Sequence, residues 1–296
     1  FGMITTSGLL QAVINGLLIG GVYSIAALGL SLIWGVMKIV NLAHGVFIML
    51  GAYISYFAFT LLGIHPFLSL PISLILGLCL GLLIYKHLIH RILERATYEL
   101  EMEMMTLLFT FAISILIYGS ALNAWGADLR GIPIALPTWS PGGFPIPISR
   151  LAAFLATLGL AGILYIFLRT TYMGKAIRAV TQSRSSAMLV GIDPERIFAI
   201  SFSIGVAYAM IAGSITSFTT AITPHLGTLY LLKSFTIVVL GGLGNPIGAM
   251  VGGLILGLAE SFTTLFASYA LSPAVAFVIL IMILILRPQG LFEMLR

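Results

Sequence analysis

Long stretches without a charged residue constrain this chain more than any other feature. Asp, Glu, Lys and Arg are absent from seven stretches: 1–37, 39–85, 104–127, 151–168, 197–232, 234–259 and 261–286. A membrane-spanning helix needs about 20 apolar residues. Only 8% of the residues are charged, against about 25% in soluble domains, so polar side chains cannot cover a globular surface. The sequence therefore predicts an integral membrane protein.

Prolines and glycines divide these stretches into eight or nine crossings. Stretch 39–85 holds two crossings, separated at Gly63 and Pro66, because proline stops a helix. Stretch 234–266 is too long for one crossing and too short for two, which indicates a short or re-entrant segment near 234–246. The expected fold is an all-α, polytopic helical bundle in one domain, 1–296, and nine crossings are favoured. We expect helices at 8–33, 40–62, 66–86, 104–123, 150–169, 197–221, 234–243, 247–267 and 270–286.

Basic residues predict the orientation. Arg130, Arg150 and Lys233 fall on connectors of one side, and the other 11 of the 14 basic residues fall on the opposite side. The positive-inside rule makes the richer side cytoplasmic, with the N-terminus external and the C-terminus cytoplasmic. The net charge of +5 therefore indicates sidedness in a membrane and not nucleic-acid binding. We expect no cleavable signal peptide in 1–37, which lacks a basic n-region. The richer side carries Lys38, Lys86, Arg91, Arg95, Arg169, Lys175, Arg178, Arg184, Arg196, Arg287 and Arg296.

Glycines four residues apart predict close helix packing. Such pairs form flat strips on a helix that let a second backbone approach. Segment 16–24 (GLLIGGVYS) also resembles 253–261 (GLILGLAES), either as an inverted repeat or by chance. The pairs are Gly16–Gly20, Gly77–Gly81, Gly244–Gly248–Gly252 and Gly253–Gly257.

A few polar residues lie inside predicted spans. Glu260 is the acidic residue of these spans, and a buried carboxylate is a functional hypothesis by default. It could equally be protonated, or bonded to a hydroxyl of a neighbouring helix. His44 is either part of a transport path or a satisfied interfacial histidine. Candidate residues along a path are Asn15, Tyr23, His44, Thr216, Thr220 and Glu260.

Hydroxyl groups are dense at the end of the sixth predicted span. Thr216, Thr219, Thr220 and Thr223 fall on one face if the helix continues through them. This face either lines an aqueous path, or its hydroxyls bond to carbonyls four residues earlier.

The cytoplasmic segment 171–192 reads as a short amphipathic helix. Thr171 can cap it, and Ile177, Val180, Ala187 and Met188 form an apolar stripe, with Lys175, Arg178 and Arg184 off the stripe. Asp193 and Pro194 then start the next helix. The segment either lies on anionic headgroups or docks onto a cytoplasmic partner. On the other side, the Pro-rich loop 125–149 suits a partner contact, a lid or an interfacial anchor.

Motifs for chemistry are absent from the sequence. Gly174-Lys175 is followed by Ala176, so it is not a phosphate loop, and no His-Glu-x-x-His or Gly-x-Ser-x-Gly motif occurs. The single Cys79 excludes an intrachain disulfide and a cysteine zinc site. We expect neither an enzyme nor a resident metal or cofactor, so energy coupling would need a separate ATPase.

Three stretches carry a family resemblance. They are Gln11–Ser24 with the strings GVMKIVNLAHG (35–45) and LGAY (50–53), GKAIRAVTQ (174–182) with VGI (190–192), and VLGGLGNPIGAMVGG (239–253). Through them the chain resembles the permease subunits of branched-chain amino-acid ABC transporters, of the LivH type. Members often carry an acidic residue after His-Gly, where this chain has Val46.

The resemblance implies an inner-membrane subunit of an importer that works by alternating access. It implies a second, homologous permease, two cytoplasmic ATPases that use ATP, and a solute-binding protein. It also implies that the 171–192 helix couples to an ATPase through Gly174, Lys175, Ile177, Arg178, Ala187 and Gly191. Similar relatives move urea or short amides, which is the alternative substrate class. A self-contained channel or secondary carrier is a further alternative, and an intramembrane enzyme using Glu260 and His44 is another.

Overall fold

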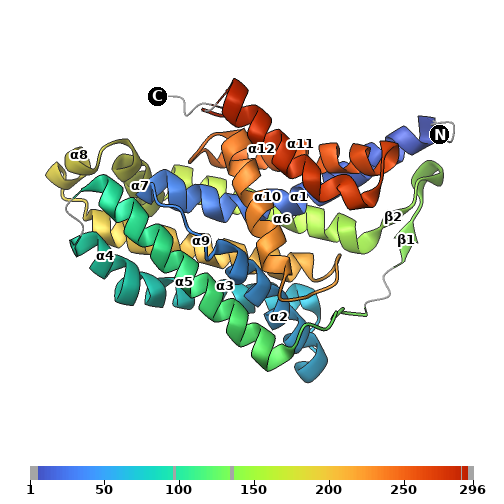
Figure 1. The fold of residues 1–296 in the computed structure, drawn as a ribbon, viewed down its shortest axis with the longest axis horizontal. Coiled ribbons are helices and arrows are strands. Elements are labelled where there is room, and N and C mark those ends of the chain that lie inside the picture. The colour runs from blue at the N-terminus through green and yellow to red at the C-terminus, as the bar shows by residue number, and fades with distance from the viewer. Residues whose placement is uncertain (1–5, 96–97, 134–136, 288, 293–296) are drawn as a thin grey trace.

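The computed structural model describes residues 6–95, 98–133, 137–287 and 289–292, which form a bundle of long helices (Figure 1). Among these residues, seven helices have the length and apolar composition to cross a membrane, and two shorter apolar helices accompany them. The predicted all-α, polytopic fold is confirmed. Arg296 lies outside the described residues. The helices are α1 (Thr6–Met37), α2 (His44–Leu62), η1 (Pro66–Leu68), α3 (Ser69–Ile84), the π-helical turn η2 (Tyr85–Ile89), α4 (His90–Arg95), α5 (Glu99–Trp125), η3 (Pro141–Gly143), α6 (Ile148–Thr170), α7 (Tyr172–Gln182), α8 (Arg184–Leu189), α9 (Pro194–Thr216), α10 (Leu226–Gly241), α11 (Pro246–Phe266), η4 (Tyr269–Leu271) and α12 (Ser272–Leu286).

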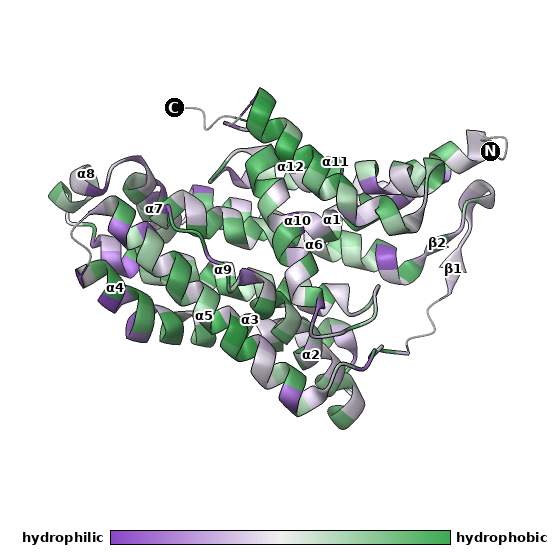
Figure 2. Ribbon diagram, in the orientation of Figure 1, coloured by the Kyte–Doolittle hydropathy of each residue, from purple (hydrophilic) through white to green (hydrophobic). Residues whose placement is uncertain are grey.

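Helices α1 and α9 form the centre of the bundle. Within the most apolar part of each helix, 89% of α1 and 83% of α9 is buried, against 17% of α5 and 22% of α6. Lipid therefore has to cover α5 and α6, whose exposed side chains are largely leucine, isoleucine and phenylalanine. Figure 2 shows that hydrophobic residues predominate along the helices in the body of the molecule.

Glycines bring α1 and α11 into close antiparallel contact. A methyl group on Gly20 would lie only 2.8 Å from the carbonyl oxygen of Gly253. A methyl group on Gly16 would lie 2.8 Å from the Cα of Leu258. No side chain larger than hydrogen fits at these positions, which is how the small-residue motif works.

The two similar segments lie in these helices and face each other. The last residue of each, Ser24 and Ser261, donates a hydrogen bond across the contact, to the carbonyl oxygens of Met250 (2.8 Å) and Ala12 (2.7 Å) respectively. Because the two helices run antiparallel and each donates one of these hydrogen bonds, the two segments are related by an approximate local two-fold axis, as in an inverted repeat.

The chain between α9 and α11 differs from the prediction. Helix α9 ends at Thr216 and does not continue to residue 221, because the following hydroxyls bond to nearby backbone carbonyls in turns. Helix α10 starts at Leu226 and not at residue 234, so it contains Lys233. Lys233 therefore lies within a helix of the bundle, and its assignment to an outer connector was wrong.

Helix α10 is a short apolar helix of 16 residues that packs against α1, α2 and α11. Its first turn approaches the start of α2, where a methyl group on Gly227 would lie 2.7 Å from the carbonyl oxygen of Gly45. The turn that follows it packs Gly244 against Gly35, near the end of α1. The short segment predicted near 234–246 is therefore present as a helix that begins earlier, at Leu226.

The two ends of the bundle carry different structures. Helices α4, α7 and α8 lie at one end, and the hairpin of β1 (Thr138–Trp139) and β2 (Ile146–Pro147) lies at the other, beside the N-terminal end of α1 (Figure 1). The hairpin falls in the Pro-rich loop 125–149. Ten of the 11 basic residues assigned to the cytoplasmic side lie in the described residues, in or next to connectors of the α7 end.

Replacing Gly20 by alanine should destabilise the bundle by about 1–3 kcal/mol, the usual cost of overpacking. Gly159 of α6 is the matched control, because nothing lies within 4 Å of a methyl group placed there. Thermal unfolding of the two detergent-solubilised variants checks this difference. An unchanged melting temperature for G20A would contradict the close α1–α11 contact.

Candidate functional site

A cavity of about 720 Å³ opens between α1, α10 and α11 at the hairpin end of the bundle. The turn between α9 and α10 and the first residues of α6 and α12 complete its wall. Gln11 of this wall donates a hydrogen bond to the carbonyl oxygen of Pro145 in the hairpin, at 3.0 Å. The hairpin therefore lies at the rim. The polar lining residues are Gln11, Asn15, Tyr23, Arg150, Thr219, Thr220, Thr223, Tyr230, Lys233, Glu260, Ser261, Thr264 and Ser272.

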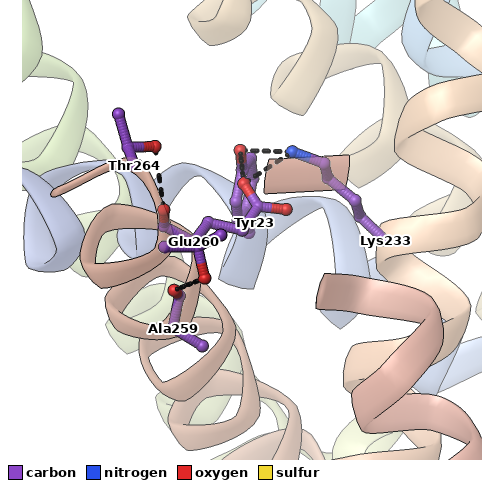
Figure 3. A network of polar contacts seen from close by, with 6 residues as sticks. Tyr23, Lys233, Ala259, Glu260 and Thr264 are labelled. Carbon is purple, nitrogen blue, oxygen red and sulfur yellow. Dashed lines mark hydrogen bonds and ion pairs between the residues drawn. The ribbon is translucent and has the colours of Figure 1, made fainter. Parts of the chain in front are cut away.

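Three charged or polar side chains meet in the cavity wall (Figure 3). Lys233 Nζ donates to Glu260 Oε2 at 2.8 Å and to the Tyr23 hydroxyl at 2.5 Å. The Tyr23 hydroxyl donates in turn to the same Glu260 oxygen, at 2.7 Å. We call these three residues the charged triad. Its two charges are paired, so the bundle holds no excess charge here.

The backbone packing accounts for the triad. Tyr23 follows Gly20 by three residues on α1, and Glu260 follows Gly257 by three residues on α11, so the glycine contact brings both side chains to the same side of the α1–α11 seam. Lys233 reaches them from α10, with its ammonium 4.1 Å from the centre of the Tyr23 ring, a cation–π arrangement.

The triad is largely buried, although it borders the cavity. The side chains of Lys233 and Glu260 are only 15% and 6% exposed. Removing one partner of such a buried pair usually costs about 3–5 kcal/mol, because the other charge is left unpaired. One interpretation left open for Glu260, a hydrogen bond to a hydroxyl of a neighbouring helix, is confirmed by its bond with Tyr23. The ion pair of Glu260 with Lys233 was not predicted from the sequence.

Four of the six predicted path residues line the cavity: Asn15, Tyr23, Thr220 and Glu260. The structure does not bring the other two to it. His44 is fully buried, and its Nε2 lies 2.7 Å from the carbonyl oxygen of Ala26. Thr216 is also fully buried and donates to the carbonyl oxygen of Ala212, four residues earlier.

The prediction that Thr216, Thr219, Thr220 and Thr223 share one helical face was wrong, because α9 ends at Thr216. Thr219, Thr220 and Thr223 still reach the cavity, from the turn between α9 and α10. The hydroxyls of Thr219 and Thr220 donate hydrogen bonds to the carbonyl oxygen of Thr216, although both residues line the cavity.

Helices α7 and α8 form a second candidate site, at the opposite end (Figure 1). The hydroxyl of Thr171 accepts a hydrogen bond from the backbone N–H of Gly174 at 3.0 Å, so the predicted cap is confirmed. Gly174 is buried against the end of α6, where a methyl group would lie 2.5 Å from the Cα of Leu168. Asp193 caps α9 with Pro194 behind it, also as predicted.

The predicted single helix is two helices. Ser183 breaks it, because its extended backbone and its hydroxyl, which accepts from the N–H of Ser186, start a new cap. Ile177, Val180 and Ala187 are buried as the stripe predicts, but Met188 is 51% exposed. The break turns α8 away from the direction of α7, so Met188 leaves the stripe.

Both apolar and basic side chains are exposed on α7 and α8. Leu189 is 89% and Val190 74% exposed, next to Met188. We call residues 188–190 the α8 tip. Lys175 and Arg178 of α7 and Arg184 of α8 are exposed as well, and Gly191 ends the turn with a φ of 79°. Such an exposed apolar patch is typical of a protein-interaction surface.

A cavity of about 430 Å³ lies between parts of α7, α1 and α6 and the turn before α11. Its wall combines Ile177 and Arg178 of α7, Ser31 and Gly35 of α1, and the turn 244–246. Since α7 packs against α1, α6 and α9, it contacts the central helices directly.

The chain matches known transport proteins along almost its whole length. Residues 12–286 match the family model described as branched-chain amino acid transport system / permease component. The chain is 30% identical to the high-affinity branched-chain amino acid transport system permease protein BraD of Pseudomonas aeruginosa, with 95% of each chain covered. It is 32% identical to the corresponding protein LivH of Escherichia coli K12, over 95% of this chain and 94% of LivH.

A more distant relative is LivM, a permease protein of the same Escherichia coli system. It is 24% identical over 93% of this chain and 68% of LivM. No solved structure matches the chain. The family model and the two relatives that are at least 30% identical agree, and the chain belongs to the family of branched-chain amino acid transport permease components.

Proposed function

We propose that this chain is a permease subunit of an ATP-driven importer for branched-chain amino acids. The observation that carries the proposal is the family match over residues 12–286, which includes the α7–α8 element and all of the cavity wall except Gly8 and Gln11. Relatives named for branched-chain amino acids do not favour urea or short amides as the substrate. A self-contained channel or carrier stays the competing mechanism.

The distribution of basic residues supports an orientation in the cell inner membrane. Helices α4, α7 and α8 carry a large share of them and would face the cytoplasm, by the positive-inside rule. The start of α1, the hairpin and the cavity mouth would then face outward, and the C-terminus inward. In this orientation the cavity opens toward the side from which an importer receives its substrate.

The proposal requires other chains. Because the sequence has no phosphate-binding motif, ATP would be used by two separate cytoplasmic ATPases. LivH and LivM belong to one system in Escherichia coli, and both are similar to this chain, which supports pairing with a second, homologous permease. A solute-binding protein would deliver the amino acid to the outer mouth. No cofactor is proposed on this chain itself.

The mechanism would be alternating access through α1. The start of α1 lines the outer cavity, and its end lines the cavity beneath α7. When the ATPases close, they would displace the α7–α8 element and tilt α1 with it. The outer cavity would then close while a path opens inward between the two permeases.

Purification of the tagged chain from native membranes in mild detergent tests the assembly. We expect a homologous permease and two ATP-binding-cassette subunits in the complex, because this chain has no energy source of its own. Mass spectrometry of the bound chains is the measurement. If the chain alone takes up leucine into liposomes, without any nucleotide-binding subunit, it is a self-contained carrier and the proposal fails.

The α8 tip should be needed for ATPase binding. Changing Leu189 to aspartate places a charge in an apolar contact, and we expect the amount of co-purified ATPase to fall about tenfold, equivalent to about 1.4 kcal/mol of binding free energy. Leu129 is a matched control, because it is a comparably exposed leucine (78%) in the loop at the opposite end. L129D should retain the ATPases, and equal retention by L189D would contradict docking through the tip.

Arg178 should contribute to coupling. It is exposed on α7 and also borders the cavity between α7 and α1. In the reconstituted complex, R178E should lower uptake per ATP hydrolysed while the chain remains inserted and assembled. Unchanged coupling, measured as the ratio of leucine uptake to phosphate release, would contradict this role. Ile177 is less suitable for the test, because it is buried against its own bundle.

A further inference from the structure

We propose that Lys233 and Glu260 are the recognition site for the charged head group of the substrate, and that the substrate replaces their ion pair. The carboxylate of a free α-amino acid would take the place of Glu260 on the lysine, and its ammonium group would take the place of Lys233 on the glutamate. This inference rests on the proposed function and adds the chemical class that the cavity selects, an unblocked zwitterion.

The ion pair has the chemistry of an amino acid's own head group. It joins one primary ammonium and one carboxylate at 2.8 Å, and both residues line the cavity. Lys233 Nζ has three N–H donors and uses two of them on described residues, Glu260 and Tyr23. Oε1 of Glu260 is buried and accepts no hydrogen bond from any described residue. Each member of the pair therefore has bonding capacity left for a ligand.

Charge decides which ligands can take part in this exchange. The pair is neutral as a whole, and a zwitterion is neutral as a whole, so the bundle gains no net charge when the substrate enters. A ligand with only an ammonium or only a carboxylate would leave one charge without a partner among apolar helices, which is costly. Urea and neutral amides carry no charge and cannot replace either member of the pair.

The rest of the cavity suits an aliphatic side chain. Leu18 and Val22 of α1 and Leu226 and Leu229 of α10 line it together with the ion pair. Tyr23 acts as a positioning residue, because its hydroxyl bonds to both charged groups. The edge of the Tyr230 ring packs against it, with the ring centres 5.8 Å apart.

A purely structural role is the competing explanation. The triad joins α1, α10 and α11, and it could hold these helices together without contacting substrate. The two roles differ in how they respond to ligand chemistry. If the triad only holds the helices together, the complex does not distinguish a zwitterion from a cation of the same shape. If the triad is a recognition site, the complex binds the zwitterion more strongly.

The test measures weak ligand binding to the complete complex in nanodiscs, without the solute-binding protein, by saturation-transfer NMR. The probes are leucine, leucinol (a cation), 4-methylpentanoate (an anion) and 4-methylpentanamide (neutral). For the wild-type complex we expect binding of leucine about tenfold stronger than that of each other probe, or about 1.4 kcal/mol. Equal binding of all four probes would overturn the inference without the need for any variant.

The double variant K233M/E260Q removes both charges together and leaves none unpaired. We expect it to assemble with the ATPases and to lose the preference for leucine. Y208F is the matched control, because the Tyr208 hydroxyl donates to the Leu160 carbonyl oxygen away from this cavity. Retention of the leucine preference by K233M/E260Q would overturn the inference.

Uptake separates the inference from the function on which it rests. Wild-type complex, supplied with binding protein and ATP in proteoliposomes, should take up leucine, and K233M/E260Q should take up about tenfold less. Equal uptake by both overturns the inference and leaves the proposed function intact. No uptake by the wild-type complex overturns the proposed function, and the inference with it.

Discussion

The close contact between α1 and α11 determines most of this structure. Lipid tails are as apolar as leucine side chains, so helices in a membrane associate through packing and hydrogen bonds, not through a hydrophobic driving force. Glycines supply that packing here, and Ser24 and Ser261 add a hydrogen bond on each side of the local two-fold. The same approach sets Tyr23 opposite Glu260, and the glutamate then requires the cation that α10 supplies.

Lipid also explains how much of the fold could be predicted from sequence. Charge-free stretches located the seven long apolar helices of the described residues, because a charge facing lipid is costly wherever it lies. They did not locate α10 correctly, because that helix contains Lys233. The caps at Thr171 and Asp193 were predictable because a side chain bonds to backbone only two or three residues away. Helix ends were less predictable at Thr216 and Ser183, where hydroxyls compete for the backbone, and only the complete fold shows which conformation forms.

The candidate site was predicted in part, for a related reason. Asn15, Tyr23 and Glu260 were found because a polar side chain on an apolar helix has to face protein or water. His44 met the same criterion, but it is buried away from the cavity, with its Nε2 2.7 Å from the carbonyl oxygen of Ala26. Lys233 was assigned to an external connector because the positive-inside rule counts lysines in loops, whereas the structure places it within α10. A single lysine between two long charge-free stretches could have been read as the partner of Glu260.

Helix α1 connects the chemistry of the two ends. Its 32 residues form one continuous helix, and close contacts with α9 and α11 prevent it from bending freely. In the proposed mechanism, any tilt imposed near Gly35 has to move Tyr23 relative to Glu260 and Lys233, because those two side chains belong to other helices. The hydrogen bonds of Tyr23 to both charges would then weaken as the inner end moves. Recognition of the head group and the action of the ATPases would thus share one mechanical element, and a substrate held by the pair would be released by the same displacement that opens its way inward.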